Sequence, residues 1–524
     1  MDPAHRHVGT VAAVIGGERA RAAAVTLAVG LVLSLTAACE PEGADAATAK
    51  IVPASPRGVV AAGAEPVVEA SRFLLASAPA VVLVPADAGA EALRPAARLG
   101  IPALPDDPAG RAEAKRLGAT VVSATDPDTE AVRAVRRTDG AAIATTSEPS
   151  PLLAQLAKVA GASVVRIAAD PRTDPASVAA LRATGTSPVL TVGAPAYPVA
   201  VAQRDAQVIA GGYLALPGHH YLAMYGHPSG PALGVLGEQG PKASVARVRR
   251  LVAKYRKAAP ETSFAPAFEI IATVATASAG PRKDYSARTS IADLRPLVDE
   301  ARRAKVTVIL DLQPGRGSLL EQARHYQPLL EQPHVGLAID PEWKLGKKGK
   351  PLRRIGHVDA AEINAVSQWL ATLTRDHVLP QKLFVLHQFQ TQMIRHRGRL
   401  VTTHPELATV LHVDGQGPPG AKFGTWRTIR KDPRRGSSGA GRTSSTRTRR
   451  CSRRPAPGSR SAPTPTSSPT SEPSGPLAVS PRGPLATTFR HFVSACRRPN
   501  VVASGPGTVG TWWSRRWWSA SGRR

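Results

Sequence analysis

Short runs of β-branched and other apolar residues alternate with helical stretches from about Glu65 to about Asp432. Parallel strands need long crossover connections, which are usually helices, so this alternation is typical of βαβ units on a parallel sheet. The chain has 524 residues, enough for about three to four domains or two large ones. We therefore expect an α/β fold, and the hydrophobic content of 43% excludes a chain that is disordered throughout.

A first α/β domain is expected over residues 65–210. Its helices are predicted at Glu65–Ala78, Asp128–Arg137 and Pro151–Ala160. No glycine-rich phosphate loop follows any predicted strand, so nucleotide binding has no support. The strands are predicted at Ala80–Pro85, Ala119–Ala124, Ala141–Thr145, Ser163–Ala168 and Pro188–Val192.

A second domain is expected over residues 213–432, where the strands end in polar or aromatic residues. Eight βα units close a barrel, so we expect a (β/α)8-type barrel that is truncated or frame-shifted at its carboxyl-terminal end. Seven strands are predicted, at Tyr221–His227, Ala267–Val274, Val306–Asp311, Val335–Asp340, Leu383–Gln388, Thr409–Asp414 and Phe423–Trp426. The helices between them are predicted at Lys242–Ala258, Ser290–Ala304, Ser318–Leu330, Ala360–Thr374 and Gln392–Arg399.

Residues 1–39 have the pattern of a secretory signal. Arg19 and Arg21 precede an uncharged apolar run, Ala22–Leu35, which is too short to cross a membrane as a stable helix. The segment Leu35–Cys39 resembles a bacterial lipobox, which implies that Cys39 is acylated and holds the mature chain on the extracellular face of the cytoplasmic membrane. Ordinary signal cleavage, giving a secreted protein with a free Cys39 thiol, is the alternative. Residues 40–64 are expected to be a linker.

The formal net charge of +28 is concentrated in residues 433–524. This tail has 17 arginines, no lysine and one acid, Glu472, so it carries +16 and leaves +12 for the rest of the chain. Its Arg, Ser, Pro, Thr and Gly composition indicates disorder. A basic arm with tryptophan anchors, suited to nucleic acid or a membrane surface, is one interpretation of the tail.

A frame-shifted gene explains more of this tail. Read in one shifted frame, Arg435–Pro455 permits GVKWGWKNFFDEDAPMLTPA, and Ala462–Glu472 permits PDPDLVTYQ followed by a stop codon. We therefore predict that the tail arises from a mutation or a sequencing error, and that it binds no nucleic acid. The restored DLVTYQ segment would be the eighth strand of the barrel.

The residues that carry chemistry in such a barrel lie at the carboxyl ends of its strands, because the loops there form the mouth. The sharpest cluster is Ile339–Trp343, in which Asp340 and Glu342 are two positions apart. Strand side chains alternate with period two, so both carboxylates would point the same way. Neighbouring carboxylates do not both ionise easily, which raises the pKa of one of them and prepares a general acid. The polar residues at the predicted strand ends are Tyr225 and His227, Asp311 and Gln313, Asp340 and Glu342, His387 and Gln388, and Asp414 and Gln416.

Asp340-Pro341-Glu342 resembles the Asp-x-Glu motif at the end of the fourth strand in several barrel glycoside hydrolases. The resemblance implies that Glu342 donates a proton to the glycosidic oxygen and that Asp340 supports it electrostatically. Leu337 and Ala338 stand where longer forms of the motif have aspartates. Sugar binding without turnover is one alternative, and a turn-capping Asp340 with a solvated Glu342 is another. The residues expected to contact the sugar are Tyr225, His227, Asp311, Trp343, His387, Asp414 and Trp426.

Two further resemblances concern longer parts of the chain. The segments Tyr225–Pro228, Leu233–Gly237 and Asp340–Trp343, with the frame-restored Trp-Gly-Trp-Lys-Asn string, resemble a family of uncharacterised secreted actinobacterial proteins. That family has no assigned activity. The stretch from Val81 to Leu104 resembles the type 2 cell-wall-binding repeat of secreted bacterial proteins, which implies that the first domain docks on the cell wall.

Metal binding is not expected. His219, His220 and His227 are candidate ligands, but no carboxylate stands at a recognised spacing from them, so we predict neither a metal nor another cofactor. The sequence thus predicts a lipid-anchored surface protein whose partner is a cell-wall or capsular polysaccharide. Its barrel is interpreted as a glycoside hydrolase or, alternatively, as a non-catalytic glycan-binding module.

Overall fold

The computed structural model describes residues 58–122, 140–349, 353–413 and 418–430, together with the short strands β1 (Val52–Pro53) and β19 (Phe492–Ala495). The signal sequence with Cys39, the predicted helix Asp128–Arg137, Asp414 and the frame-shift prediction for the tail lie outside the described residues. Within the described ranges, no helix is long and apolar enough to span a membrane.

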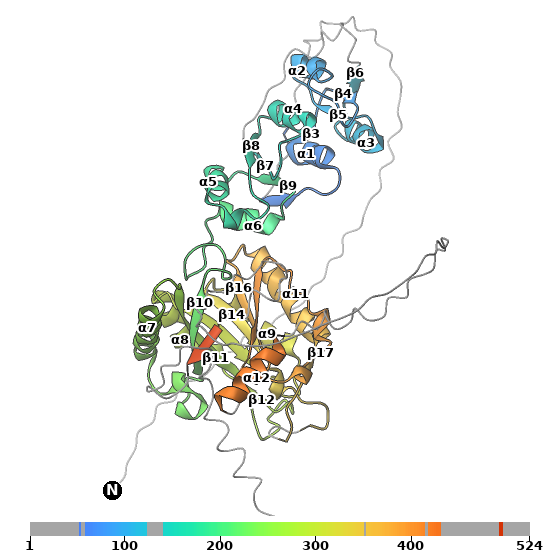
Figure 1. The fold of residues 1–524 in the computed structure, drawn as a ribbon. Helices are drawn as coiled ribbons and strands as arrows, with labels where there is room; N and C mark the ends of the chain where they lie inside the picture. The colour runs from blue at the N-terminus through green and yellow to red at the C-terminus, as the bar shows by residue number, and fades with distance from the viewer. Residues whose placement is uncertain are drawn as a thin grey trace, which may run out of the picture. The chain divides into compact units, whose positions relative to one another are not determined.

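The N-terminal part of the chain, up to residue 210, contains two parallel sheets (Figure 1). One has the strand order β5-β4-β6 and the other β2-β9-β7-β8, while β1 pairs antiparallel with β3. The strands are β2 Val59–Ala61, β3 Leu75–Ser77, β4 Ala80–Val84, β5 Ala103–Pro105, β6 Thr120–Val122, β7 Ala142–Thr145, β8 Ser163–Arg166 and β9 Val189–Val192. The helices are α1 Pro66–Leu74, α2 Arg94–Leu99, α3 Pro108–Arg116, α4 Pro151–Ala160, α5 Pro175–Ala183 and α6 Ala196–Gln203.

The two sheets are built in the same way. In each, a βαβαβ segment places its first strand in the centre, with its second strand on one side and its third on the other. The first segment is β4-α2-β5-α3-β6 and the second is β7-α4-β8-α5-β9. All five strands predicted between residues 80 and 192 are confirmed, and β2, β3 and β5 were not predicted.

The C-terminal part is dominated by one curled parallel sheet. Its strands are, in chain order, β10 His220–Gly226, β11 Phe264–Ala275, β13 Thr307–Leu312, β14 Val335–Ile339, β16 Lys382–His387 and β18 Leu407–His412. Each of these strands pairs with the next one, β19 pairs parallel with β10, and the short β12 (Ser286–Arg288) pairs antiparallel with β11. Strands β15 (Val358–Asp359) and β17 (Ile394–Arg395) form a separate pair.

The helices that connect the strands from β10 to β16 lie outside the sheet (Figure 1). They are α7 Pro241–Ala258, α8 Ile291–Arg303, α9 Leu319–His325, α10 Gln327–Leu330 and α11 Ala360–Asp376; α12 (Pro419–Ile429) follows β18. Several begin at a capping side chain that accepts a hydrogen bond from the first turn: Ser290 caps α8, Ser318 caps α9 and Asp359 caps α11. Such caps satisfy backbone N–H groups that have no partner within the helix.

Two sequence-based predictions in this part are wrong. Phe423–Trp426 is not a strand but lies within α12, which has a proline in its first turn, a position where proline favours helix initiation. The segment predicted as a helix at Gln392–Arg399 contains β17 between two 3₁₀ turns, because His396 has left-handed backbone angles that end a helix. A complete (β/α)8 barrel is therefore not confirmed; the described residues show six consecutive parallel strands, with β19 beside the first of them.

The curled sheet has a different core on each face. On its outer face, large residues such as Phe268, Leu310 and Phe384 pack against the surrounding helices. On its inner face most of the apolar residues are smaller, because the interior of a strongly curled sheet is narrow, although Tyr221 also lies in this cluster. The inner apolar residues from the six strands include Ala223, Ala267, Ile309, Ala338, Val385 and Val410.

Candidate functional site

One polar residue from each of the six consecutive strands lies two positions beyond an inner apolar residue. Since side chains two positions apart in a strand share a face, these polar residues form a layer at the carboxyl end of the sheet interior, which we call the polar layer. Five belong to the strands themselves, and Asp340 follows β14 directly. The polar layer consists of Tyr225, Glu269, Asp311, Asp340, His387 and His412.

Tyr225 lies at the centre of the acidic part of the polar layer. Its hydroxyl group donates a hydrogen bond to Oδ2 of Asp311 (3.0 Å) and accepts one from Nε2 of Gln313 (3.2 Å). Burial raises the pKa of Tyr225 well above its ordinary value, and the negative charges of Asp311, Asp340 and Glu269 raise it further. The phenol therefore stays protonated and acts as a hydrogen-bond donor among three carboxylates.

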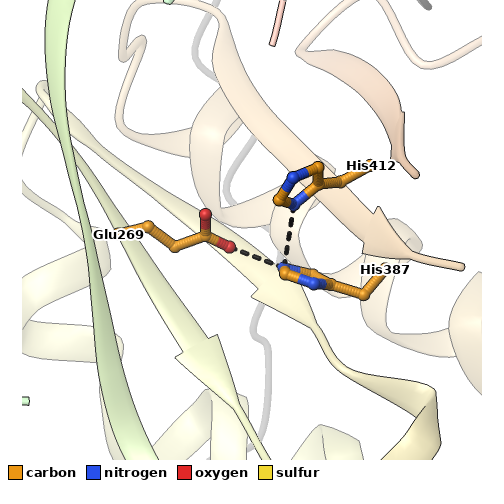
Figure 2. A group of neighbouring side chains, drawn as sticks. All are labelled: Glu269, His387 and His412. Carbon is orange, nitrogen blue, oxygen red and sulfur yellow. Dashed lines mark hydrogen bonds and ion pairs between the residues drawn. The ribbon is translucent and has the colours of Figure 1, made fainter. Parts of the chain in front are cut away.

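Glu269, His387 and His412 form the other part of the polar layer. Nε2 of His387 lies 2.6 Å from Oε1 of Glu269 and 3.4 Å from Nδ1 of His412. Figure 2 shows the carboxylate and the His412 ring both directed at this nitrogen. All three residues are at most 5% exposed, and Oε2 of Glu269 is buried with no hydrogen-bond partner among the described residues.

Strand order explains how these three side chains meet. His387 and His412 are neighbours because they occupy paired positions of β16 and β18. Glu269 is on β11, and strands β13 and β14 separate it from β16 along the sheet. The hydrogen bond between Glu269 and His387 therefore crosses the interior of the curled sheet.

The predicted catalytic pair, Asp340 and Glu342, lies in two different environments. Asp340 is buried in the polar layer. Strand β14 ends at Ile339, and Glu342 and Trp343 lie in a 3₁₀ turn, Pro341–Trp343, where both are half-buried. The period-two alternation that predicted a common direction for the two carboxylates therefore does not extend to Glu342.

The loop that follows this turn is held by a lysine. Nζ of Lys344 donates to Oε1 of Glu362 on α11 (2.5 Å) and to the backbone oxygen of Gly317 (2.8 Å). The backbone oxygen of Glu342 accepts a hydrogen bond from the N–H of Gly356 (2.6 Å). These contacts fix the backbone on both sides of Trp343.

Of the other predicted sugar contacts, Tyr225, Asp311 and His387 belong to the polar layer. His227 instead uses both ring nitrogens in local hydrogen bonds, to Ser229 Oγ and Thr289 Oγ1 (both 2.7 Å), and burial lowers its pKa. Trp426 lies on α12, where the guanidinium of Arg430 stacks over its ring at 4.1 Å.

Sequence reasoning missed Glu269 and His412. Each had a signal: Glu269 is a charged residue inside a long apolar strand, and His412 stands two positions before Asp414 in the predicted strand Thr409–Asp414. A buried carboxylate is costly unless it is paired, so a glutamate in such a strand indicates a specific partner.

No known protein family, curated protein or solved structure matches the chain. Its chemistry must therefore be inferred from the polar layer itself. Three carboxylates, two imidazoles and a protonated phenol lie together at the carboxyl end of a parallel sheet, where ligand sites of α/β folds occur. Such a set can transfer protons, donate hydrogen bonds to hydroxyl-rich ligands, or hold a cation.

Proposed function

We propose that the C-terminal part hydrolyses glycosidic bonds in cell-wall or capsular polysaccharides. The observation that carries the proposal is the polar layer, which supplies three carboxylates at the end of the sheet where barrel enzymes place their catalytic groups. Glycoside hydrolysis ordinarily needs a pair of carboxylic acids with different protonation states. In this proposal the sheet is completed to a (β/α)8 barrel by the strand of the restored reading frame.

The half-buried Glu342 is the general acid in this proposal. It follows the buried Asp340 by two residues in the turn after β14, and in this proposal it delivers a proton to a glycosidic oxygen at the mouth. Tyr225 and Asp311 form a hydrogen-bonded pair in the polar layer. The half-buried ring of Trp343, in the same turn as Glu342, offers a face for a sugar ring.

The location of the protein is part of the proposal. Acylation of Cys39 would hold the chain on the extracellular face of the cytoplasmic membrane, and the N-terminal α/β part would dock on the cell wall. The paired βαβαβ segments support this docking role because they offer two similar surfaces to a repeating polymer.

A non-catalytic glycan-binding module is the second candidate. The observation that favours it is the burial of Glu269, Asp311 and Asp340, each at most 3% exposed, together with the engagement of Asp311 by Tyr225. Buried and hydrogen-bonded carboxylates can shape a binding surface without exchanging protons with a substrate.

A glycan panel tested with the chain in its restored reading frame separates the two candidates. The panel is assayed for release of reducing ends and for retention of the chain on immobilised glycan. Glu342→Gln should lower turnover about 10²- to 10⁴-fold, because it removes a transferable proton at nearly constant shape, while retention survives. Glu321→Gln, on the exposed face of α9, is the matched control and should leave turnover unchanged.

The binding-only candidate predicts no turnover by the parent chain and loss of retention in Trp343→Ala. Equal turnover of parent and Glu342→Gln would refute the role of Glu342. A parent chain that neither cleaves nor retains any glycan of the panel would contradict both candidates.

A further inference from the structure

We propose that Glu269, His387 and His412 bind one divalent transition-metal ion of the zinc class. Their ligand atoms, one carboxylate oxygen and two imidazole nitrogens, lie within 4.8 Å of one another, and all three residues are buried. Imidazole and carboxylate together suit zinc and its neighbours, whereas calcium and magnesium prefer sets of oxygen atoms.

The spacing of the ligand atoms fits a tetrahedral ion. Zinc bonds to nitrogen of about 2.0–2.1 Å place two ligand atoms of a tetrahedron about 3.3–3.4 Å apart. The distance of 3.4 Å between His387 Nε2 and His412 Nδ1 agrees with this value. Glu269 Oε1 and His387 Nε2 are closer, at 2.6 Å. The ion would replace their hydrogen bond and increase the distance between these two atoms by about 0.7 Å.

Glu269 gives independent support for an ion. Its side chain is fully buried, and Oε2 has no hydrogen-bond partner among the described residues. An ionised carboxylate in such a place needs a compensating positive charge. Asp311 and Asp340 add negative charge nearby, because both of them, like Glu269, raise the pKa of Tyr225. None of the six residues of the polar layer is a lysine or an arginine.

The position of the ion gives it a structural effect. Glu269 is on β11, whereas His387 and His412 are on β16 and β18, so the ion would link strands that face each other across the sheet interior. Strand β18 is the last of the six consecutive strands. The ion would therefore hold the curled sheet together near this edge, whether or not the chain cleaves glycans.

Metal content measured without any glycan tests the inference independently of turnover. The full chain is stripped with a chelator, incubated with Zn²⁺ alone, passed through a desalting column and analysed for zinc. The parent should retain about one ion per chain, and His387→Gln and His412→Gln should each lose at least tenfold in affinity. His377→Gln, at the exposed end of α11, is the matched control and should retain zinc like the parent.

Thermal unfolding of the same samples adds a second measurement. Zinc at a free concentration of about 100 times its Kd should raise the Tm of the parent by roughly 5–10 °C, and it should leave the Tm of the two histidine variants unchanged. Folded variants that retain zinc like the parent would overturn the inference. So would a parent chain that retains no zinc.

Cobalt spectroscopy of the parent covers the case in which the variants fail to fold. Co²⁺ bound by two histidines and a glutamate gives tetrahedral d–d bands without a thiolate charge-transfer band. Those bands support the site, whereas a thiolate band would assign the metal to a cysteine and refute it.

Discussion

Lys382, the first residue of β16, is a buried lysine, and its protonation should make the stability of the chain depend on pH. Its side chain is 2% exposed, and Nζ donates hydrogen bonds to the backbone oxygens of Gln332 and Val335, each at 2.9 Å. Burial lowers the pKa of Lys382 from 10.5 to about 7. The folded state therefore disfavours the charged ammonium form that the unfolded chain prefers at neutral pH.

The direction of the pH dependence follows from proton binding. Between pH 7 and pH 10.5 the unfolded chain holds a proton on Lys382 that the folded chain has released, so stability rises with pH in this window. Below pH 7 both states hold the proton, and Lys382 gives no further pH dependence. The full slope is about 1.4 kcal/mol per pH unit, and between pH 7 and pH 9 the gain amounts to about 2 kcal/mol.

Urea unfolding of the full chain at pH 7, 8 and 9 measures this gain. The free energy of unfolding of the parent should rise by about 2 kcal/mol relative to Lys382→Met over this range, because the variant lacks the titrating group. Lys254→Met, at an exposed position of α7, should follow the pH dependence of the parent. Parallel pH profiles for the parent and Lys382→Met would refute the reasoning.

Three further predictions concern other parts of the chain. Tyr225→Phe should lower the free energy of unfolding by about 1–3 kcal/mol in urea titrations, because Asp311 loses a buried hydrogen-bond donor. The control is Tyr255→Phe, at a half-buried tyrosine of α7, and an equal effect of the two substitutions would contradict the prediction. Fatty-acid labelling should depend on Cys39 and vanish in Cys39→Ser, and equal labelling of the variant would exclude acylation there. Related genes sequenced across codons 425–475 should encode a Trp-Gly-Trp-Lys-Asn-like string and stop near codon 472, whereas a shared Arg/Ser-rich tail would rule out the frame shift.

The sequence predicted the strands well because their apolar runs are separated by longer connecting segments, most of which contain a helix. Strands β10, β11, β13, β14, β16 and β18 all overlap the predicted segments. The failure at Phe423–Trp426 has a local cause: two aromatic residues in a short segment favour a strand, but Pro419 starts a helix that continues through them.

The candidate site was only partly predictable. Tyr225, Asp311, Asp340 and His387 were found because each lies at the end of a predicted strand. Glu269 was missed because it lies within a strand and not at its end. It belongs to the polar layer because β11 is staggered relative to its neighbours, so that Glu269 pairs with Tyr225 of β10. Its partner is 118 residues away, and which strands face each other depends on how strongly the sheet curls, which strand periodicity does not determine.

The polar layer also has a consequence for how the chain is made. Each of its six residues comes from a different strand, and the first and the last, Tyr225 and His412, are almost two hundred residues apart in the sequence. A nascent chain that ends before His412, or a proteolytic fragment that lacks one of these strands, therefore holds only an incomplete set of these groups. The Glu269–His387 contact can form only after β16 has been synthesised, so chemistry at this site is tied to completion of the sheet and cannot precede it.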